Sequence, residues 1–159
     1  MGGKGGSFWT SQGYAWGGVV LALVLLAGCG SRARESRSRE ESTLKPLAIL
    51  YGQYIGQHRG QPPTNEAEFR QFVQTQGPSL LQSFGLSNIE ELFVSPRDGK
   101  PYKILYGPTA LKGPPGPAGS PVVAYEQEGR GGKRWVASAM GAVEEVDEAR
   151  FKELVPTGP

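Results

Sequence analysis

The stretch SPRDGKPYKILY, residues 95–106, decides the fold class because the spacing of apolar residues changes within it. Residues 96–99 (PRDG) combine proline, aspartate and glycine, which favours a turn. Tyr102, Ile104 and Tyr106 then stand at every second position, as large side chains do in a β-strand. Before the stretch the apolar residues follow a helical period. We therefore place the boundary between a helical part and a strand-rich part here.

The helical part begins near Thr43. Apolar residues recur at spacings of three and four over residues 47–58, which predicts one amphipathic helix. The glycine and prolines of residues 59–63 end it. Gly52 and Gly56 lie four positions apart in this helix, which indicates close packing against a neighbouring element.

Polar residues mark where the later helices begin. Asn65 with Glu68, and Ser87 with Glu90, have the spacing of helix N-caps and their partners. Asp147 is expected to cap a closing helix. Between the turn and Asp147 the alternating pattern predicts strands at residues 122–125, 134–139 and 143–146. Helices first, an antiparallel sheet next and one closing helix last make an α+β domain, which we assign to residues 43–155.

Cys29, the only cysteine, follows the one long apolar segment of the chain. It closes the run Leu26-Ala27-Gly28-Cys29, and the sequence beyond it is polar. The apolar core before it is shorter than the roughly 20 residues that a membrane-spanning helix needs. A weakly basic start, a short apolar core and a small-residue cut site are typical of a secretory signal.

This run resembles the lipobox of bacterial lipoprotein signals. The resemblance implies that residues 1–28 are a signal peptide and that Cys29 carries fatty acyl groups such as palmitate. Membrane lipid would then be the partner of Cys29, and the protein would sit on a bacterial cell membrane, facing the periplasm or the exterior. Gly30, in place of the aspartate that marks inner-membrane retention, favours the outer membrane. An uncleaved signal anchor, or a plain signal with an incidental cysteine, is the alternative.

Residues 29–42 join this lipidated cysteine to a spacer of arginine, glutamate and serine. Such a composition cannot bury enough apolar surface to fold, which predicts a flexible tether. The arginines would gain about 1 kcal/mol each next to anionic headgroups, although the interleaved glutamates oppose this. Residues 156–159 are expected to be a disordered tail.

Composition argues against several function classes. The formal net charge is +2, without the clustered positive charge of a nucleic-acid-binding protein. One cysteine allows no disulfide within the chain, and one cysteine with one histidine does not make a transition-metal site. His58, the only histidine, is expected to be a packing or capping residue rather than a base. No cofactor is expected.

Several short motifs in the α+β domain carry a second resemblance. They are the first helix ending at Gln57-His58, the motif of residues 95–102, the segments 123–126 and 132–136, and Gly141 before a valine strand. Together they resemble the globular head of bacterial type II pseudopilins and related pilin-like domains. The resemblance implies a long N-terminal helix and short helices packed on a small antiparallel sheet, used for protein–protein assembly. A lipobox stands where a pilin has its filament-building helix. We therefore expect a lipid-anchored head that has the pilin-like fold but does not assemble into a filament.

We therefore expect a non-catalytic interaction module with a protein partner in the cell envelope, and not an enzyme. The candidate contact residues are aromatics near the sheet, Tyr102, Tyr106, Tyr125 and Trp135, most of which are expected to belong to the core. Two alternatives remain open. An envelope enzyme would act on glycan through the carboxylates of Glu126 and Glu128. A calcium-stabilised, pseudopilin-like secretion component would bind the ion through Asp98, Glu126 and Glu128.

Overall fold

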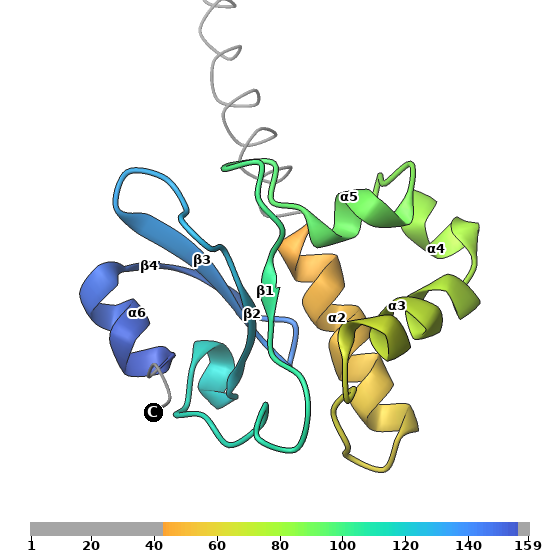
Figure 1. The fold of residues 1–159 in the computed structure, drawn as a ribbon, viewed down its shortest axis with the longest axis horizontal. Helices are drawn as coiled ribbons and strands as arrows, with labels where there is room; N and C mark the ends of the chain where they lie inside the picture. The colour runs from red at the N-terminus through yellow and green to blue at the C-terminus, as the bar shows by residue number, and fades with distance from the viewer. Residues whose placement is uncertain (1–42, 156–159) are drawn as a thin grey trace, which may run out of the picture.

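The structure of the chain, a computed structural model, describes residues 43–155 (Figure 1). The apolar segment, the lipobox with Cys29, the tether and the expected C-terminal tail lie outside the described residues. No helix within residues 43–155 has the length and the apolar character needed to cross a bilayer.

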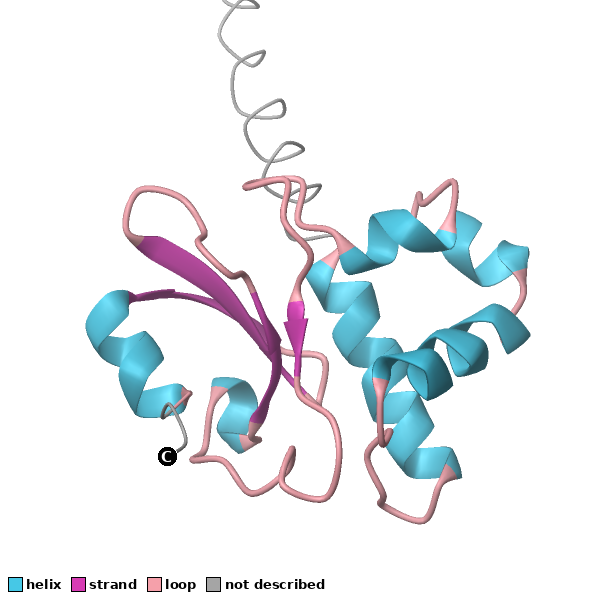
Figure 2. Ribbon diagram, viewed as in Figure 1, coloured by secondary structure: helices cyan, strands magenta, loops and turns pink. Residues whose placement is uncertain are grey.

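The described residues form an α+β fold, as the sequence predicts (Figure 2). The elements are α2 (Leu44–Gln57), α3 (Glu66–Thr75), α4 (Pro78–Ser83), α5 (Ile89–Phe93), β1 (Lys103–Ile104), the short 3-10 helix η1 (Pro117–Gly119), β2 (Val122–Tyr125), β3 (Lys133–Ser138), β4 (Val143–Asp147) and α6 (Glu148–Leu154). The four strands make one antiparallel sheet in the order β1-β2-β3-β4.

The sheet lies between two sets of helices. α2 packs on β2 and β3 and is flanked by α3 and α5, whereas α6 covers the opposite face of the sheet (Figure 1). Strand residues alternate between the two sides, because successive side chains of a strand point to opposite faces. In β3, Ala137 belongs to the core under α2, and Val136 belongs to the smaller cluster under α6.

α2 is the central element of the larger core. One side of the helix is buried in this core and consists of Leu44, Leu47, Ala48, Leu50, Tyr51 and Tyr54. The hydroxyl of Tyr51 donates a hydrogen bond of 2.6 Å to the carbonyl of Leu105, next to β1. Its ring meets Phe69 of α3 edge-on, with the ring centroids 5.4 Å apart. α2 thereby joins the short helices to the sheet.

The helix starts follow the polar residues of the sequence, with one displacement. The side chains of Asn65 and Asp147 accept the expected backbone N–H groups and cap α3 and α6. The cap of α5 is Asn88, and not Ser87 as the sequence suggested. The carboxylate of Glu91 accepts the backbone N–H of Ser87, so the capping pair is shifted by one residue.

β1 is shorter than the strand expected over residues 102–106. The backbone N–H of Tyr102 donates to the carbonyl of Phe93, at the end of α5, at 2.8 Å and not to β2. Pro101 has no N–H to donate and forms an isolated bridge with Val94. The start of the expected strand is thus paired with the end of the helical part.

Candidate functional site

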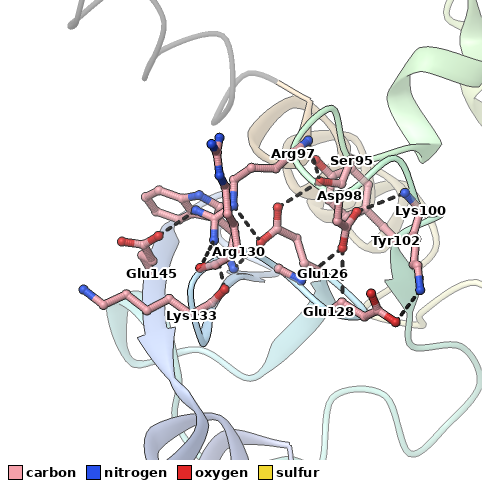
Figure 3. A network of polar contacts seen from close by, with 12 residues as sticks. Ser95, Arg97, Asp98, Lys100, Tyr102, Glu126, Glu128, Arg130, Lys133 and Glu145 are labelled. Carbon is pink, nitrogen blue, oxygen red and sulfur yellow. Dashed lines mark hydrogen bonds and ion pairs between the residues drawn. The ribbon is translucent and has the colours of Figure 1, made fainter.

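Residues 95–100 form a tight turn that lies against the hairpin joining β2 to β3 (Figure 3). The backbone N–H of Ser95 donates to the carbonyl of Lys100 at 2.9 Å, and the N–H of Gly99 donates back to Ser95 at 2.9 Å. Gly99 has φ of 70°, a conformation that residues with a side chain adopt only at a cost. The polar residues of this turn and of residues 126–133, together with Glu145, are called the turn–hairpin cluster below.

Glu126 is the buried centre of the cluster, with 1% of its surface exposed. Its Oε1 accepts a hydrogen bond of 2.8 Å from the Ser95 hydroxyl, and its Oε2 accepts one of 2.9 Å from the backbone N–H of Trp135. The Nε of Arg97 lies 3.4 Å from Oε2, close enough for an ion pair although its N–H does not point along a hydrogen bond.

Burial raises the pKa of Glu126 above its ordinary value, because the charged form loses hydration. The hydrogen bonds from Trp135 and Ser95 and the charge of Arg97 oppose this rise without cancelling it. Both carboxylate oxygens are nevertheless occupied by donors of the protein itself.

Arg97 joins the turn to the far strand of the sheet, with only 6% of its side chain exposed. Its Nη1 donates to the carboxylate of Glu145 in β4 at 2.6 Å. Its Nη2 donates to the carbonyl of Lys133 at 2.9 Å and reaches the carbonyl of Arg130 at 3.4 Å. The planar guanidinium thus spans the end of the hairpin and β4, a geometry that suits its fixed fork of donors.

Asp98 closes the other side of the cluster. Its Oδ1 accepts the N–H of Lys100 at 3.0 Å, and its Oδ2 accepts the N–H groups of Gly129 and Glu128 at 3.0 and 3.3 Å. Partial burial would raise the pKa of Asp98, but these three backbone hydrogen bonds outweigh it and hold the pKa below its usual range. The side chains of Lys100 and Glu128 form an exposed ion pair above it.

The arrangement does not favour a calcium site. Asp98, Glu126 and Glu128 do come from one corner of the fold, as the sequence suggested, but their oxygens accept from different donors of the chain. Within residues 43–155 no group of three or more acidic, histidine or cysteine residues is placed to hold a metal ion.

The paired-carboxylate enzyme is not favoured either. Such a mechanism needs both carboxyl groups to reach the substrate. Glu126 is buried within the cluster, whereas the side chain of Glu128 is 65% exposed and paired with Lys100.

The four candidate contact aromatics lie in the two hydrophobic cores or against them. Tyr102 is buried, and its hydroxyl lies 2.6 Å from the hydroxyl of Thr43 in a hydrogen bond. Tyr106, Tyr125 and Trp135 are half-buried. Trp135 packs against the larger core, and Tyr125 meets Phe151 of α6 edge-on, with ring centroids 5.0 Å apart. The core placement expected for most of these aromatics is confirmed, and together they form no exposed contact surface.

His58 has the packing role that the sequence suggested. It is the residue directly after α2, and its ring stacks on Tyr54 with centroids 3.8 Å apart. Its Nδ1 lies 2.8 Å from the carbonyl of Tyr54.

Sequence reasoning missed the role of Ser95, Arg97 and Glu145 in the cluster. Ser95 and Glu126 are separated by 31 positions, and no local pattern predicts that they meet. One signal was available. A serine and an arginine flank the turn at Ser95 and Arg97, and Glu126 ends a strand of apolar residues, where an acid needs a partner.

Comparison of the chain with protein-family models, with curated proteins and with solved structures finds no match. Conclusions about function therefore depend on the residues of this chain.

Proposed function

We propose that the protein is a bacterial lipoprotein whose head is a non-catalytic interaction module. The observation that carries the proposal is the run Leu26-Ala27-Gly28-Cys29 after an apolar segment too short for an ordinary membrane span. Cleavage before Cys29 and acylation of its thiol and amine would leave the head of residues 43–155 on a tether. Two or more acyl chains give stable anchoring, whereas one is marginal.

The polar chemistry of the head supports a role in binding rather than in catalysis. The buried carboxylate of Glu126 and the guanidinium of Arg97 are occupied by groups of the chain. A general acid or base must reach a proton of its substrate, directly or through one water molecule. A cluster whose donors and acceptors face one another holds a turn and a hairpin in fixed positions, which suits a rigid binding surface.

We further propose that the head is pilin-like and that it binds a protein partner in the envelope. The order of a first helix, short helices, a four-stranded antiparallel sheet and a closing helix supports this proposal. The turn of residues 95–100, fixed between α5 and β1, belongs to one of the several motifs that carry the resemblance. The outer membrane is the favoured location, because Gly30 follows the cysteine.

The anchor is tested by mass spectrometry of the protein extracted from bacterial membranes. We expect an N-terminus at Cys29 that carries diacylglyceryl and acyl groups. The variant Cys29→Ser should accumulate with residues 1–28 attached and without added lipid mass. An unmodified N-terminus, or a serine variant of unaltered size and mass that stays membrane-bound, would refute the lipoprotein proposal.

The partner is tested by cross-linking in intact cells, followed by identification of the linked proteins. A partner captured by the wild-type protein should be lost when the surface of the head is altered while its unfolding curve is unchanged. Trp135→Ala is unsuited to this purpose, because Trp135 packs against the core and its loss should destabilise the fold.

A further inference from the structure

The sheet carries two separate apolar cores, one on each face. The larger core lies under α2. The smaller core consists of Val122, Val136 and Val146 of the strands together with Phe151 and Leu154 of α6. Figure 1 shows α6 on the outer side of the sheet, away from α2 and the helices that flank it. α6 is therefore the helix that closes the smaller core.

α6 is held on the sheet by few contacts. It has seven residues, of which Phe151 and Leu154 are buried, and a helix of that length is marginal on its own. Within residues 43–155, the one polar side-chain contact between α6 and the sheet is the ion pair of Glu148 with Arg134 of β3, at 2.9 Å. The guanidinium of Arg134 also lies over the Phe151 ring, 4.4 Å from its centroid. Two apolar side chains and one arginine thus fasten the helix.

The strands under α6 have other support. β3 and β4 pair along their length, from Lys133 with Asp147 to Ala137 with Val143. The opposite face of the sheet is fixed to α2, because Val123, Ala124 and Ala137 belong to the larger core. Arg97 bonds Glu145 of β4 to the turn of residues 95–100. These contacts do not involve α6, so they persist when α6 leaves the sheet.

We propose that α6 is a releasable cover, which detaches from the sheet as one unit while the rest of the head stays folded. Detachment exposes the apolar face formed by Val122, Val136 and Val146. A segment with few buried apolar contacts opens at a lower cost in free energy than the whole domain. The inference goes beyond the proposed function and does not depend on the membrane anchor.

Asp147 is the hinge of this movement. β4 ends at Asp147 and α6 begins at Glu148, with no residue between them. On detachment the seven residues of α6 lose their packing, and a segment of that length does not keep a stable helix in water. The amide hydrogens of α6 therefore become exchangeable, and the side chains beneath it become reactive, in the same opening event.

Cysteine labelling distinguishes the two faces of the sheet. Val136 and Val123 are fully buried valines of neighbouring strands, the first in the core under α6 and the second in the core under α2. The full-length variants Val136→Cys and Val123→Cys are treated with a maleimide under native conditions, and mass spectrometry of the peptides separates each new site from Cys29. We expect the cysteine at 136 to react about tenfold faster or more. Equal rates at the two positions would overturn the inference.

A second substitution separates local opening from global unfolding. Val73 of α3 is buried in the larger core, so Val73→Ala destabilises the closed and the open head alike. It should speed labelling at position 123 about tenfold and leave labelling at position 136 unchanged. Arg134→Gln weakens only the closed head and should speed labelling at both positions equally, by about fivefold. A response of position 136 to Val73→Ala as large as that of position 123 would refute separate opening.

Amide hydrogen exchange of the wild-type protein decides the question without any substitution in the cores. The N–H of Arg150, near the start of α6, bonds the side chain of Asp147, and the N–H of Val155 bonds the carbonyl of Phe151. Detachment as one unit should give these two amides protection factors within about threefold of each other and well below those of β3. Fraying from the end of α6 alone would leave Arg150 as protected as β3, which would refute the releasable cover.

Discussion

The carbonyl oxygen of Ala139 lies 2.5 Å from the position that a Cβ atom on Gly52 would occupy. Gly52 is in the middle of α2, and Ala139 follows β3, so the helix touches the backbone of the sheet at this point. A glycine is required here because any side chain would collide with a main-chain atom that cannot rotate away.

We expect Gly52→Ala to destabilise the protein by about 1–3 kcal/mol, the usual cost of forcing extra atoms into a packed contact. Chemical denaturation gives this change in the free energy of unfolding. Gly56→Ala, four residues later, is the control, since nothing lies within 4 Å of its Cβ position. It should stabilise by about 0.5–1 kcal/mol, because alanine favours a helix over glycine. Equal effects at both positions would contradict the contact.

Removal of the buried carboxylate at Glu126 should be costly. Glu126→Ala leaves the Ser95 hydroxyl, the Trp135 N–H and the Arg97 guanidinium without their shared acceptor, and we expect a loss of about 3–5 kcal/mol. Glu126→Gln keeps the shape and one acceptor oxygen, and should lose less. Thermal or denaturant unfolding of the two variants measures the difference.

The difference in unfolding free energy between the wild type and Glu126→Gln should also depend on pH. The pKa of Glu126 is raised in the folded protein, so its contribution to stability is full below about 4.5, the ordinary value, and declines as pH rises through the folded pKa. Glutamine has no such dependence. The stability advantage of the wild type over the variant should therefore shrink as pH rises from 4 to 8. An advantage that grows over this range would contradict the raised pKa.

Arg97→Lys should behave as a disruptive change although it keeps the charge. A lysine cannot donate at once to Glu145 and to the carbonyl of Lys133, as the guanidinium does. We expect a loss of about 1.5–3 kcal/mol, the range for hydrogen bonds to charged groups, measured by denaturant unfolding. Arg150→Lys is the control, since the ion pair of Arg150 with Glu153 is exposed and such pairs contribute about 0–1 kcal/mol.

Acid unfolding should depend on Glu68. The hydrogen bond from the Thr64 hydroxyl, and then that from the Tyr54 hydroxyl, lower the pKa of Glu68 to about 2. A lowered pKa contributes stability that is present above about 4.5 and is lost as pH falls toward 2. Glu68→Gln should flatten the fall in unfolding free energy over this range, measured by denaturant titrations at successive pH values. Tyr54→Phe, which removes one of the two hydroxyl donors, should give an intermediate slope.

The local features of the fold could be predicted from the sequence. β2 was expected at residues 122–125 and is found there, because its apolar residues are bounded by a proline and an acid. Asn65 and Asp147 cap helices as expected, since an N-cap is a contact between residues three positions apart. The α+β class followed from the change of period at residues 95–106.

The contacts between distant segments could not be predicted in the same way. Of the two glycines in α2, only Gly52 meets a neighbour, and the sequence does not tell them apart. Alternation in a strand does not say which face is covered by a helix, so it cannot decide whether Trp135 and Tyr102 are core or contact residues. The cluster around Glu126 joins residues up to 48 positions apart, as Arg97 and Glu145 show.

The bond between Thr43 and Tyr102 has a mechanical consequence. Under the proposed anchoring, a pull on the chain before the head would enter the described residues at Thr43, and the hydroxyl bond would pass part of the load to Tyr102, next to β1. Tyr102 is also held by its backbone N–H to Phe93, so the load divides between the helical half and the strands. If the head is tethered as proposed, this sharing of the load between α2 and the strands would oppose unfolding from its N-terminal end.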